Sequence, residues 1–300
     1  MIDGASRKKR RTTVHVAHQH LLGVINTESV RFEAGQLVRI LDAGCGSCRL
    51  LAFLAENLPR SNSTVTYEFY GFDVYDFWPL ADFGEAIDDL ARQFPEISWQ
   101  DRISRIPMQD NWPYPDAYFD VIISNQVGEH LNNHDHFFSE IARCLAPSGF
   151  SVNLFPLRHV IMEWHVLVPF AHRIKNFDVL KAFIAACASI GKGAARRRAA
   201  SVSVDAYSAN RAEYVIKYTH YISYSELLTL SKRHGLLLSM RYTKEFYTQK
   251  IRRILSRPVA VTYARKRSLF GDWLLVFLLR YVQGVTVVLE KGGHFRPKSR

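Results

Sequence analysis

The sequence predicts an α/β fold in which a mostly parallel, doubly wound sheet carries helices on both faces. The first observation is a repeated alternation of short apolar runs with amphipathic segments of helical length, because each crossover between parallel strands needs such a segment. The second is composition. With 48% hydrophobic and 22% charged residues, the chain of 300 residues is typical of a globular protein and not of a disordered one. We therefore expect one large α/β core.

The first half of the chain contains four apolar runs separated by three segments of helical length. Each apolar run has the length of a buried strand, and the segments between them place apolar residues three and four positions apart, as on one face of a helix. A helix after the third strand is expected to close at the turn Pro147-Ser148-Gly149. The expected strands are 37–41, 64–72, 118–124 and 150–155, and the expected helices are 50–58, 83–94 and 136–145.

The alternation stops after Phe155 and resumes near residue 222. Ser223 or Ser225 is a suitable N-cap for a helix that ends at Gly235. Strands are expected at 236–240 and 284–289. The segments between these regions lack strands of comparable strength, so we expect mainly helical insertions that cap a site or dock a partner.

Charge is unevenly distributed along the chain, whose formal net charge is +11. Residues 41–140 hold 17 of the 28 acidic residues but 5 of the 39 basic ones, so the remainder is strongly basic. This asymmetry suggests a cofactor on the acidic part and an anionic partner on the basic part, although basic residues that only solvate helices fit equally well. Four cysteines are too few for a disulfide scaffold, and no run reaches the ~18 uncharged apolar residues of a spanning helix. We expect a cytoplasmic protein.

The most informative stretch is the glycine-rich turn at 42–48, Asp-Ala-Gly-Cys-Gly-Ser-Cys, between the first strand and its helix. Glycine allows the backbone to approach a ligand closely, and the helix N-terminus behind it offers N–H groups to an anion. Asp73 ends the next strand, where a carboxylate can accept hydrogen bonds from both hydroxyls of a ribose. Cys45 and Cys48 form a C-x-x-C pair, but no second ligand pair accompanies it, so a metal or redox role is not expected.

Five motifs in the right order resemble the class I S-adenosylmethionine-dependent methyltransferases. The turn at 42–48 matches their acidic-x-Gly-x-Gly-x-Gly motif except at Cys48, and Asp73 matches their second motif. Residues 110–124 and 124–131 are similar to the segments around the family's fourth strand, and 141–149 to the turn before its fifth. The resemblance implies a Rossmann-like, seven-stranded sheet, methyl transfer, and S-adenosylmethionine as cofactor. Cys48 then either crowds the methionine end of the cofactor or packs away from it.

When the chain is aligned with the strand and helix order of a doubly wound sheet, the resemblance extends over roughly residues 38–155 and 222–291. It divides the chain into an N-terminal tail and helix (1–37), a cofactor-binding half of the core (38–155), an inserted substrate or lid segment (156–221), and a C-terminal completion of the core (222–300). The last part carries a basic insertion at 243–282.

For the cofactor, the resemblance implies contacts from the ends of the strands. Asp42 and Gly44 are expected near the methionine moiety, Asp73 on the ribose, and Asp110 on the adenine amine. Met108 or Gln109 is the alternative to Asp110 at the adenine. The expected cofactor-binding residues are Asp42, Gly44, Cys45, Gly46, Asp73, Asp110 and Asn125.

The acceptor is expected beyond the fourth and fifth strands. The pattern Glu-x-His-x-x-x-Pro-x-x-His at 163–172 resembles methyltransferases found with sugar and polysaccharide biosynthesis. His165 with Glu163 could deprotonate or orient a sugar hydroxyl, and Trp164 could stack on a pyranose face. The predicted catalytic residues are His165, Glu163 and His130, the last with a structural role as its alternative. The predicted substrate residues are Trp164, His172, Gln126 and Glu129.

A divalent metal held by Glu163, His165 and His172 lacks a clear fourth ligand, so no metal is predicted. The leading hypothesis is O-methylation of a hydroxyl on a sugar or glycan, whether nucleotide-, lipid- or polymer-linked.

Two other interpretations use the basic half of the chain. Basic residues at 196–198 and 250–267, the latter interleaved with aromatic side chains, would suit an RNA methyltransferase, but no recognisable RNA-binding module accompanies them. A non-catalytic scaffold that retains the fold is the third interpretation. The apolar segment 273–281 beside the basic cluster is expected to be a core helix, with peripheral attachment to an anionic membrane surface as the alternative.

Overall fold

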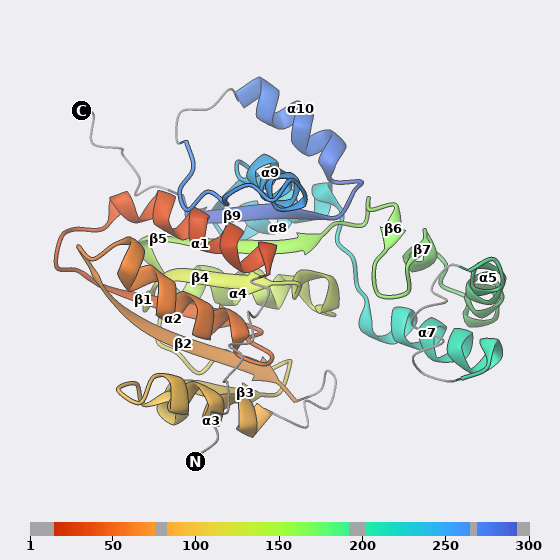
Figure 1. The fold of residues 1–300 in the computed structure, drawn as a ribbon, viewed down its shortest axis with the longest axis horizontal. Coiled ribbons are helices and arrows are strands. Elements are labelled where there is room, and N and C mark those ends of the chain that lie inside the picture. Colours follow the sequence, from red (N-terminus) through yellow and green to blue (C-terminus); the bar gives the residue numbers. More distant parts are fainter. Residues whose placement is uncertain (1–14, 76–82, 192–201, 265–268, 293–300) are drawn as a thin grey trace, which may run out of the picture.

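The computed structural model describes residues 15–75, 83–191, 202–264 and 269–292. A seven-stranded sheet forms the centre of the molecule, in the order β3-β2-β1-β4-β5-β9-β8 (Figure 1). The strands β1 to β5 pair in parallel, and β9 is antiparallel to both of its neighbours. The mostly parallel, doubly wound α/β fold is confirmed. The strands are β1 (Leu37–Ala43), β2 (Thr66–Val74), β3 (Ile103–Ile106), β4 (Phe119–Asn125), β5 (Leu145–Pro156), β8 (Leu236–Ser239) and β9 (Gly284–Lys291).

Helices cover both faces of this sheet, and each face has its own hydrophobic core. One core includes Leu51 and Phe246 from the helices with Ile40 from the sheet, and the other includes Phe138 and Leu227 with Leu41. Because Ile40 and Leu41 are consecutive strand residues, their side chains point to opposite faces. The first face carries α1 (Val16–Glu28), α2 (Arg49–Ser61), α3 (Phe83–Gln93) and α9 (Thr243–Ile254), and the second carries α4 (His134–Cys144) and α8 (Tyr224–Arg233).

Two parts of the core differ from the sequence prediction. The expected turn 147–149 lies inside β5, which already begins at Leu145; the pairing with β4 shifts there from Phe119↔Leu145 to Val121↔Phe150. Strand β3 was not predicted, because its four residues are mostly half-exposed and carry no continuous apolar run. In addition, α9, at the start of the expected basic insertion, packs beside α1 and contributes Phe246 to the core (Figure 1).

The inserted segment between β5 and α8 forms a lobe at the end of the sheet where β4 and β5 terminate (Figure 1). It contains the small hairpin of β6 (Met162–Glu163) and β7 (Val168–Pro169), the short helix η4 (Ala171–Arg173), α5 (Phe177–Ser189) and α7 (Val204–Tyr218). Helices α5 and α7 pack against each other around a third hydrophobic core that includes Leu180, Ile184 and Val215. The lobe therefore has its own packing and stands over the carboxyl ends of the strands.

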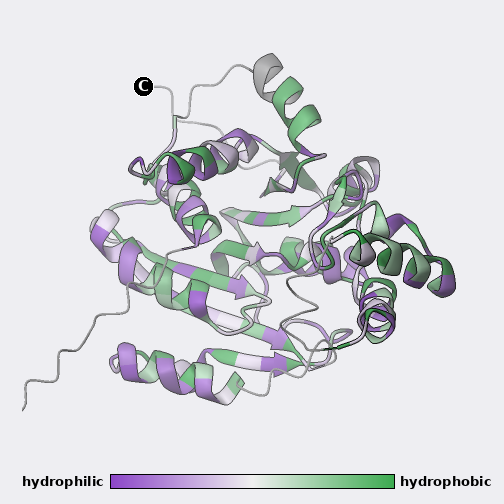
Figure 2. Cartoon of the chain, turned by 45° about the vertical axis from the view of Figure 1, so that its right-hand side comes forward, coloured by the Kyte–Doolittle hydropathy of each residue, from purple (hydrophilic) through white to green (hydrophobic). Residues whose placement is uncertain are grey.

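The helix α10 (Leu269–Leu279) lies at the edge of the molecule and is hydrophobic over the coloured part of its length (Figure 2). It exposes Leu274, Leu275, Phe277 and Leu278. Within the described residues, none of the helices has the length and apolar character needed to cross a membrane. The basic runs 7–11, 196–198 and 265–267 lie outside the described residues.

Candidate active site

A cavity of about 310 Å³ opens at the carboxyl ends of β1, β2 and β4. This is the edge at which ligands bind in doubly wound sheets. We call it the cofactor cavity. Its lining includes Gly44, Gly46, Phe72, Asp73, Met108, Trp112, Asn125, Gln126, Val127, His130 and Phe137.

The glycine-rich turn forms one wall of the cofactor cavity. Gly44 has φ +84°, and a Cβ on it would lie 2.5 Å from Cγ2 of Val127, so neither the conformation nor the space admits a side chain. The backbone N–H of Gly46 donates to Oδ2 of Asp73 at 2.5 Å, and the N–H of Val74 donates to Oδ1 at 2.7 Å. The first of these bonds joins the turn after β1 to the end of β2, and the second is local to the end of β2. Burial of the Asp73 carboxyl raises its pKa despite the two backbone donors.

Cys48 occupies the position where the family motif has its last glycine. It has φ 56°, in the left-handed region that glycine favours, and its side chain is buried in the core beneath the turn. Cys45 also packs into this core, where its side chain lies against Gly71. Neither cysteine is among the residues that line the cofactor cavity. Cys48 therefore packs away from the cofactor cavity.

The remaining walls suit an adenosyl group. Trp112 packs against Phe72 and Phe137, with ring centroids 4.9 Å and 5.5 Å away, so the three rings form an apolar wall against which a planar base can pack. Asn125 places a buried Oδ1 in the cavity wall that has no hydrogen-bond partner among the described residues. A buried acceptor without a donor is costly, and an amine or hydroxyl of a bound ligand would satisfy it. The cavity thus fits S-adenosylmethionine in both its apolar and its polar parts.

The structure places four of the expected cofactor residues, Gly44, Gly46, Asp73 and Asn125, in the lining of this cavity. Asp42 lies behind the lining, where burial, with a smaller contribution from the charge of Asp73, raises its pKa to about 8. Asp110 is exposed and outside the lining, and its backbone carbonyl accepts a hydrogen bond from Nε2 of His136. The chain turns at 107–110, so that Met108, and not Asp110, reaches the cavity.

A second cavity of about 310 Å³ shares Gln126 with the first and lies under the inserted lobe. We call it the acceptor cavity. It brings together three of the four predicted substrate residues with His165, whereas the fourth, His172, lines a separate cavity described below. The lining is Gln126, Glu129, Pro156, Trp164, His165, Arg211, Tyr214 and Tyr221.

His165 is held by a buried carboxylate at the wall of the acceptor cavity. Its Nδ1 lies 2.6 Å from Oε1 of Glu163, whose side chain has no exposed surface. Glu163 also accepts hydrogen bonds from the hydroxyl of Tyr221 at 2.7 Å and from the backbone N–H of Val166 at 2.9 Å. Burial opposes ionisation of this carboxyl, but the hydrogen bond and charge of His165 and the other donors prevail, so the pKa of Glu163 is lowered. Glu163 is therefore ionised near neutral pH.

His130 and Glu129 lie where the two cavities meet. His130 lines the cofactor cavity, its Nδ1 lies 2.6 Å from the carbonyl oxygen of Tyr218, and burial lowers its pKa to about 4. The rings of His130 and His165 have centroids 5.0 Å apart. Glu129 is 1% exposed, neither of its carboxylate oxygens has a partner among the described residues, and burial raises its pKa to about 7.

These three residues, Glu129, His130 and His165, also form the group that could hold a cation, with one ligand atom of each within 4.8 Å of the others. The metal set weighed from the sequence differs from this one. It combined His165 with Glu163 and His172, but Glu163 is already engaged by three donors.

Several lining residues were not predicted from the sequence. Phe72, Trp112, Val127 and Phe137 in the cofactor cavity lie next to recognised motifs, but their contact with the cavity depends on how the loops fold back. Arg211, Tyr214 and Tyr221 come from α7 and the segment after it. The sequence signal for an aromatic wall was the spacing of the tyrosines along α7, Tyr207, Tyr214 and Tyr218. This spacing does not reveal which face of the helix meets the core.

A family model described as a methyltransferase domain matches residues 8–191, which is more than half of the chain. The chain belongs to this methyltransferase family. It is a class I enzyme with S-adenosylmethionine as cofactor, as the motifs implied. A search of curated proteins finds no match to this methyltransferase.

Solved structures of other proteins are similar to this methyltransferase at low sequence identity. The YcgJ protein from Bacillus subtilis is 13% identical with a TM-score of 0.47, and the match covers 92% of this chain and 100% of that one. The geranyl diphosphate C-methyltransferase from Streptomyces coelicolor A3(2) is 13% identical with a TM-score of 0.44, covering 92% and 76%. A phosphoethanolamine N-methyltransferase from Haemonchus contortus is 14% identical with a TM-score of 0.45, covering 92% and 52%.

Proposed function

We propose that this methyltransferase transfers a methyl group to a hydroxyl of a sugar or glycan bound in the acceptor cavity. The observation that carries the proposal is the buried Glu163–His165 pair beside that cavity, which adjoins the cofactor cavity at Gln126. A hydroxyl is a weak nucleophile, so an enzyme that methylates one benefits from a positioned base, which histidine can supply near neutral pH.

The electrostatics of the pair support His165 as the base. The Glu163 carboxylate can only accept, so the Nδ1 of His165 carries the proton that it shares with Oε1, and Nε2 is then the basic nitrogen. The ionised Glu163 also stabilises the positive imidazolium that forms when His165 takes a proton. His130, with its lowered pKa, is neutral at the same pH and is proposed to position the acceptor at the cofactor side.

Bound S-adenosylmethionine supplies an electrophilic methyl group on a sulfonium. On transfer, the acceptor oxygen would bond to the methyl carbon as the carbon–sulfur bond breaks, and His165 would receive the hydroxyl proton. The products are the methyl ether and S-adenosylhomocysteine. The contribution of the protein is to place the hydroxyl in line with the methyl group and to receive its proton.

Aromatic side chains in the acceptor cavity support a saccharide as the acceptor. Trp164 is 39% exposed, and its indole N–H donates to the carbonyl of Val282 at 3.3 Å, which orients the ring. Tyr214 and Tyr221 line the same cavity and offer further rings with polar edges. Such amphipathic rings suit a pyranose, which has both apolar C–H faces and hydroxyl edges.

The test is transfer from S-adenosylmethionine labelled in its methyl group to a panel of free, nucleotide-linked and lipid-linked saccharides, RNA and protein. We expect label in a saccharide as an O-methyl ether, identified by mass spectrometry of the fragments. Transfer only to RNA or protein would contradict the proposal, and tight cofactor binding with no transfer to any acceptor would favour a scaffold.

A chelator control separates the proton-transfer mechanism from metal catalysis at the Glu129–His130–His165 group. Because His165 acts here through its own nitrogen, the rate should be unchanged after treatment with EDTA. A loss of activity that added divalent metal restores would show instead that these residues hold a cation.

A further inference from the structure

A cavity of about 770 Å³ adjoins the acceptor cavity, and the two share Tyr221. Neither the cofactor nor the proposed proton transfer uses it. We call it the basic cavity. It is lined by His134, Arg158, His172, Arg173, Lys175, His220, Tyr221, Ile222, Ser225, Glu226, Thr229, Leu230 and Arg233.

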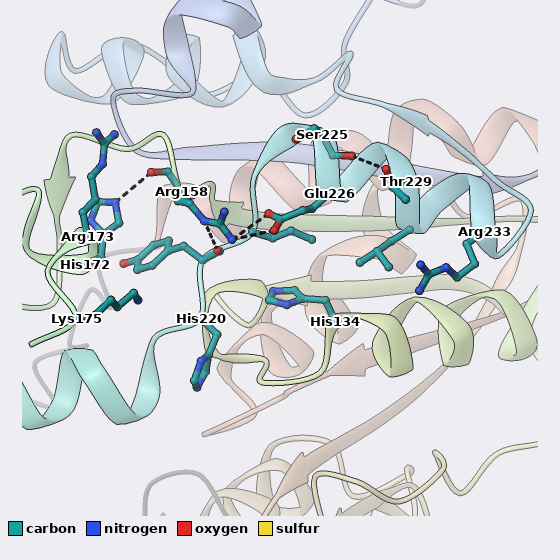
Figure 3. A pocket seen from close by; sticks show the side chains of 13 residues that line it. His134, Arg158, His172, Arg173, Lys175, His220, Ser225, Glu226, Thr229 and Arg233 are labelled. Atoms are coloured by element: carbon teal, nitrogen blue, oxygen red, sulfur yellow. Dashed lines mark hydrogen bonds and ion pairs between the residues drawn. The ribbon is translucent and has the colours of Figure 1, made fainter.

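Cationic side chains reach the basic cavity from separate elements. Arg158 follows β5, Arg173 and Lys175 belong to the inserted lobe, and Arg233 lies at the end of α8. Figure 3 shows Lys175 and Arg233 on opposite sides, with Arg158 between them. Of the lining residues in the described chain, Glu226 alone is acidic. Cations that converge on a concave space differ from the dispersed charges of a solvated helix face, because the cavity focuses their field.

Internal ion pairs neutralise part of this charge. Arg158 lies 3.0 Å from Glu226 and also donates to the carbonyl of Tyr221 (Figure 3). Arg233 lies 2.7 Å from Asp135. Lys175 is exposed and forms no ion pair with a carboxylate of the described residues. After these pairs are counted, the cavity still has excess positive charge.

Two helices add to the positive potential of the basic cavity. α8 begins at Tyr224 behind the N-cap Ser223, and Ser225 in its first turn lines the cavity. α4 begins at His134, which also lines it. The N-terminus of each helix carries partial positive charge, which favours an anion.

From this convergence of charge beside the acceptor cavity we infer that the basic cavity binds a phosphate or diphosphate attached to the saccharide that is methylated. The inference rests on the proposed function and specifies its acceptor as a phosphorylated saccharide. The shared Tyr221 places the sugar next to His165 and its anionic group among Arg158, Lys175 and Arg233. The diphosphate could come from a nucleotide sugar or from a lipid-linked saccharide, which share this chemistry.

The test measures binding of inorganic pyrophosphate by calorimetry, with no methyl donor or saccharide present. The variant Lys175→Gln/Arg233→Gln removes two charges from opposite walls. Asp135 retains His234 at 3.0 Å in this variant, which limits the structural change. The matched control is Arg60→Gln/Arg92→Gln, which removes two exposed arginines from α2 and α3. We expect saturable binding to the wild type and the control, weakened at least about tenfold in the double variant, and weakened by salt in the wild type.

Absence of saturable pyrophosphate binding, or equal binding by all three proteins, would overturn the inference. Equally fast methylation of a saccharide and of its phosphorylated form would overturn it too while leaving the proposed O-methylation intact. Conversely, pyrophosphate binding that depends on Lys175 and Arg233 would stand even if no saccharide were methylated.

Competition experiments distinguish the sources of the diphosphate. If uridine diphosphate displaces pyrophosphate at much lower concentration than a short polyprenyl diphosphate does, the acceptor is a nucleotide sugar. The reverse order indicates a lipid-linked saccharide.

Discussion

Replacing Glu163 with glutamine tests whether its carboxylate orients His165. The carboxylate accepts three hydrogen bonds, from Nδ1 of His165 at 2.6 Å, the hydroxyl of Tyr221 at 2.7 Å and the N–H of Val166 at 2.9 Å. A glutamine of the same shape has one accepting oxygen and one donating nitrogen. Because the backbone N–H of Val166 can only donate, the oxygen should turn to Val166 and the amide nitrogen to the imidazole and hydroxyl.

This arrangement reverses the tautomer of His165. The amide nitrogen would donate to Nδ1, so the imidazole proton would move to Nε2 and the basic nitrogen would no longer face the acceptor. General-base catalysis contributes ~10²–10⁴-fold, so kcat should fall at least about 100-fold while KM changes little. The loss of the buried charged hydrogen bond should cost about 1–3 kcal/mol of folding free energy.

The assay is steady-state methyl transfer with labelled S-adenosylmethionine at saturating acceptor. Tyr221→Phe is the control, because it removes one hydrogen bond to Glu163 and keeps the carboxylate beside His165; it should lower kcat less than about tenfold. Thermal unfolding and binding of S-adenosylhomocysteine show that each variant is folded. A Glu163→Gln enzyme with wild-type kcat would refute proton transfer by His165.

Three further predictions concern the cofactor turn and the acid stability of the fold. Gly44→Ala should weaken binding of S-adenosylhomocysteine about 10–100-fold in calorimetry, because the φ of +84° disfavours any side chain and the new Cβ would meet Val127 at 2.5 Å. Binding by Gly44→Ala within about twofold of the wild type would contradict this. Cys48→Gly should bind S-adenosylhomocysteine within about twofold of the wild type, because the side chain lies outside the cavity. The variant should stay folded, because relief of about 1–2 kcal/mol of left-handed backbone strain offsets the loss of buried side-chain surface. A large change in binding would place Cys48 at the cofactor. Burial disfavours the Glu28 carboxylate, but Arg241 and the other donors lower its pKa from 4.5 to about 2. The ionised carboxylate therefore contributes about 3 kcal/mol of stability above pH 4.5, and this contribution is lost as pH falls toward 2. The difference in urea-unfolding free energy between wild type and Glu28→Gln should shrink over that range, and a constant difference would contradict the prediction.

The sequence predicted the parts of the fold that depend on local pattern. The run 37–41 and the turn at 42–48 have the alternation and glycines that a buried strand and a tight turn require, and they form β1 and the wall of the cofactor cavity. Asp73 could be placed because the carboxyl ends of parallel strands lie at one edge of a sheet. Strand β3 has no such pattern, since its stability comes from pairing with β2.

Long-range packing of the loops and the lobe determines the rest of the candidate site. Asp110 was expected at the adenine, but one local turn places Met108 in the cavity. His172 lies three residues beyond the small hairpin and lines a different cavity from His165. Tyr221 meets Glu163 across 58 residues of sequence, a contact that no spacing in the chain indicates.

The most direct test of the cofactor site is a calorimetric titration of S-adenosylhomocysteine into wild-type protein, Asp73→Asn and Asp110→Asn. One equivalent should bind to the wild type and equally well to Asp110→Asn, because that side chain is exposed and outside the cavity. Asp73→Asn should bind about 10–100-fold more weakly, because it loses a charged acceptor for the ribose hydroxyls. No uptake by the folded wild type, or a loss confined to Asp110→Asn, would contradict the placement of the cofactor between the glycine turn and Asp73.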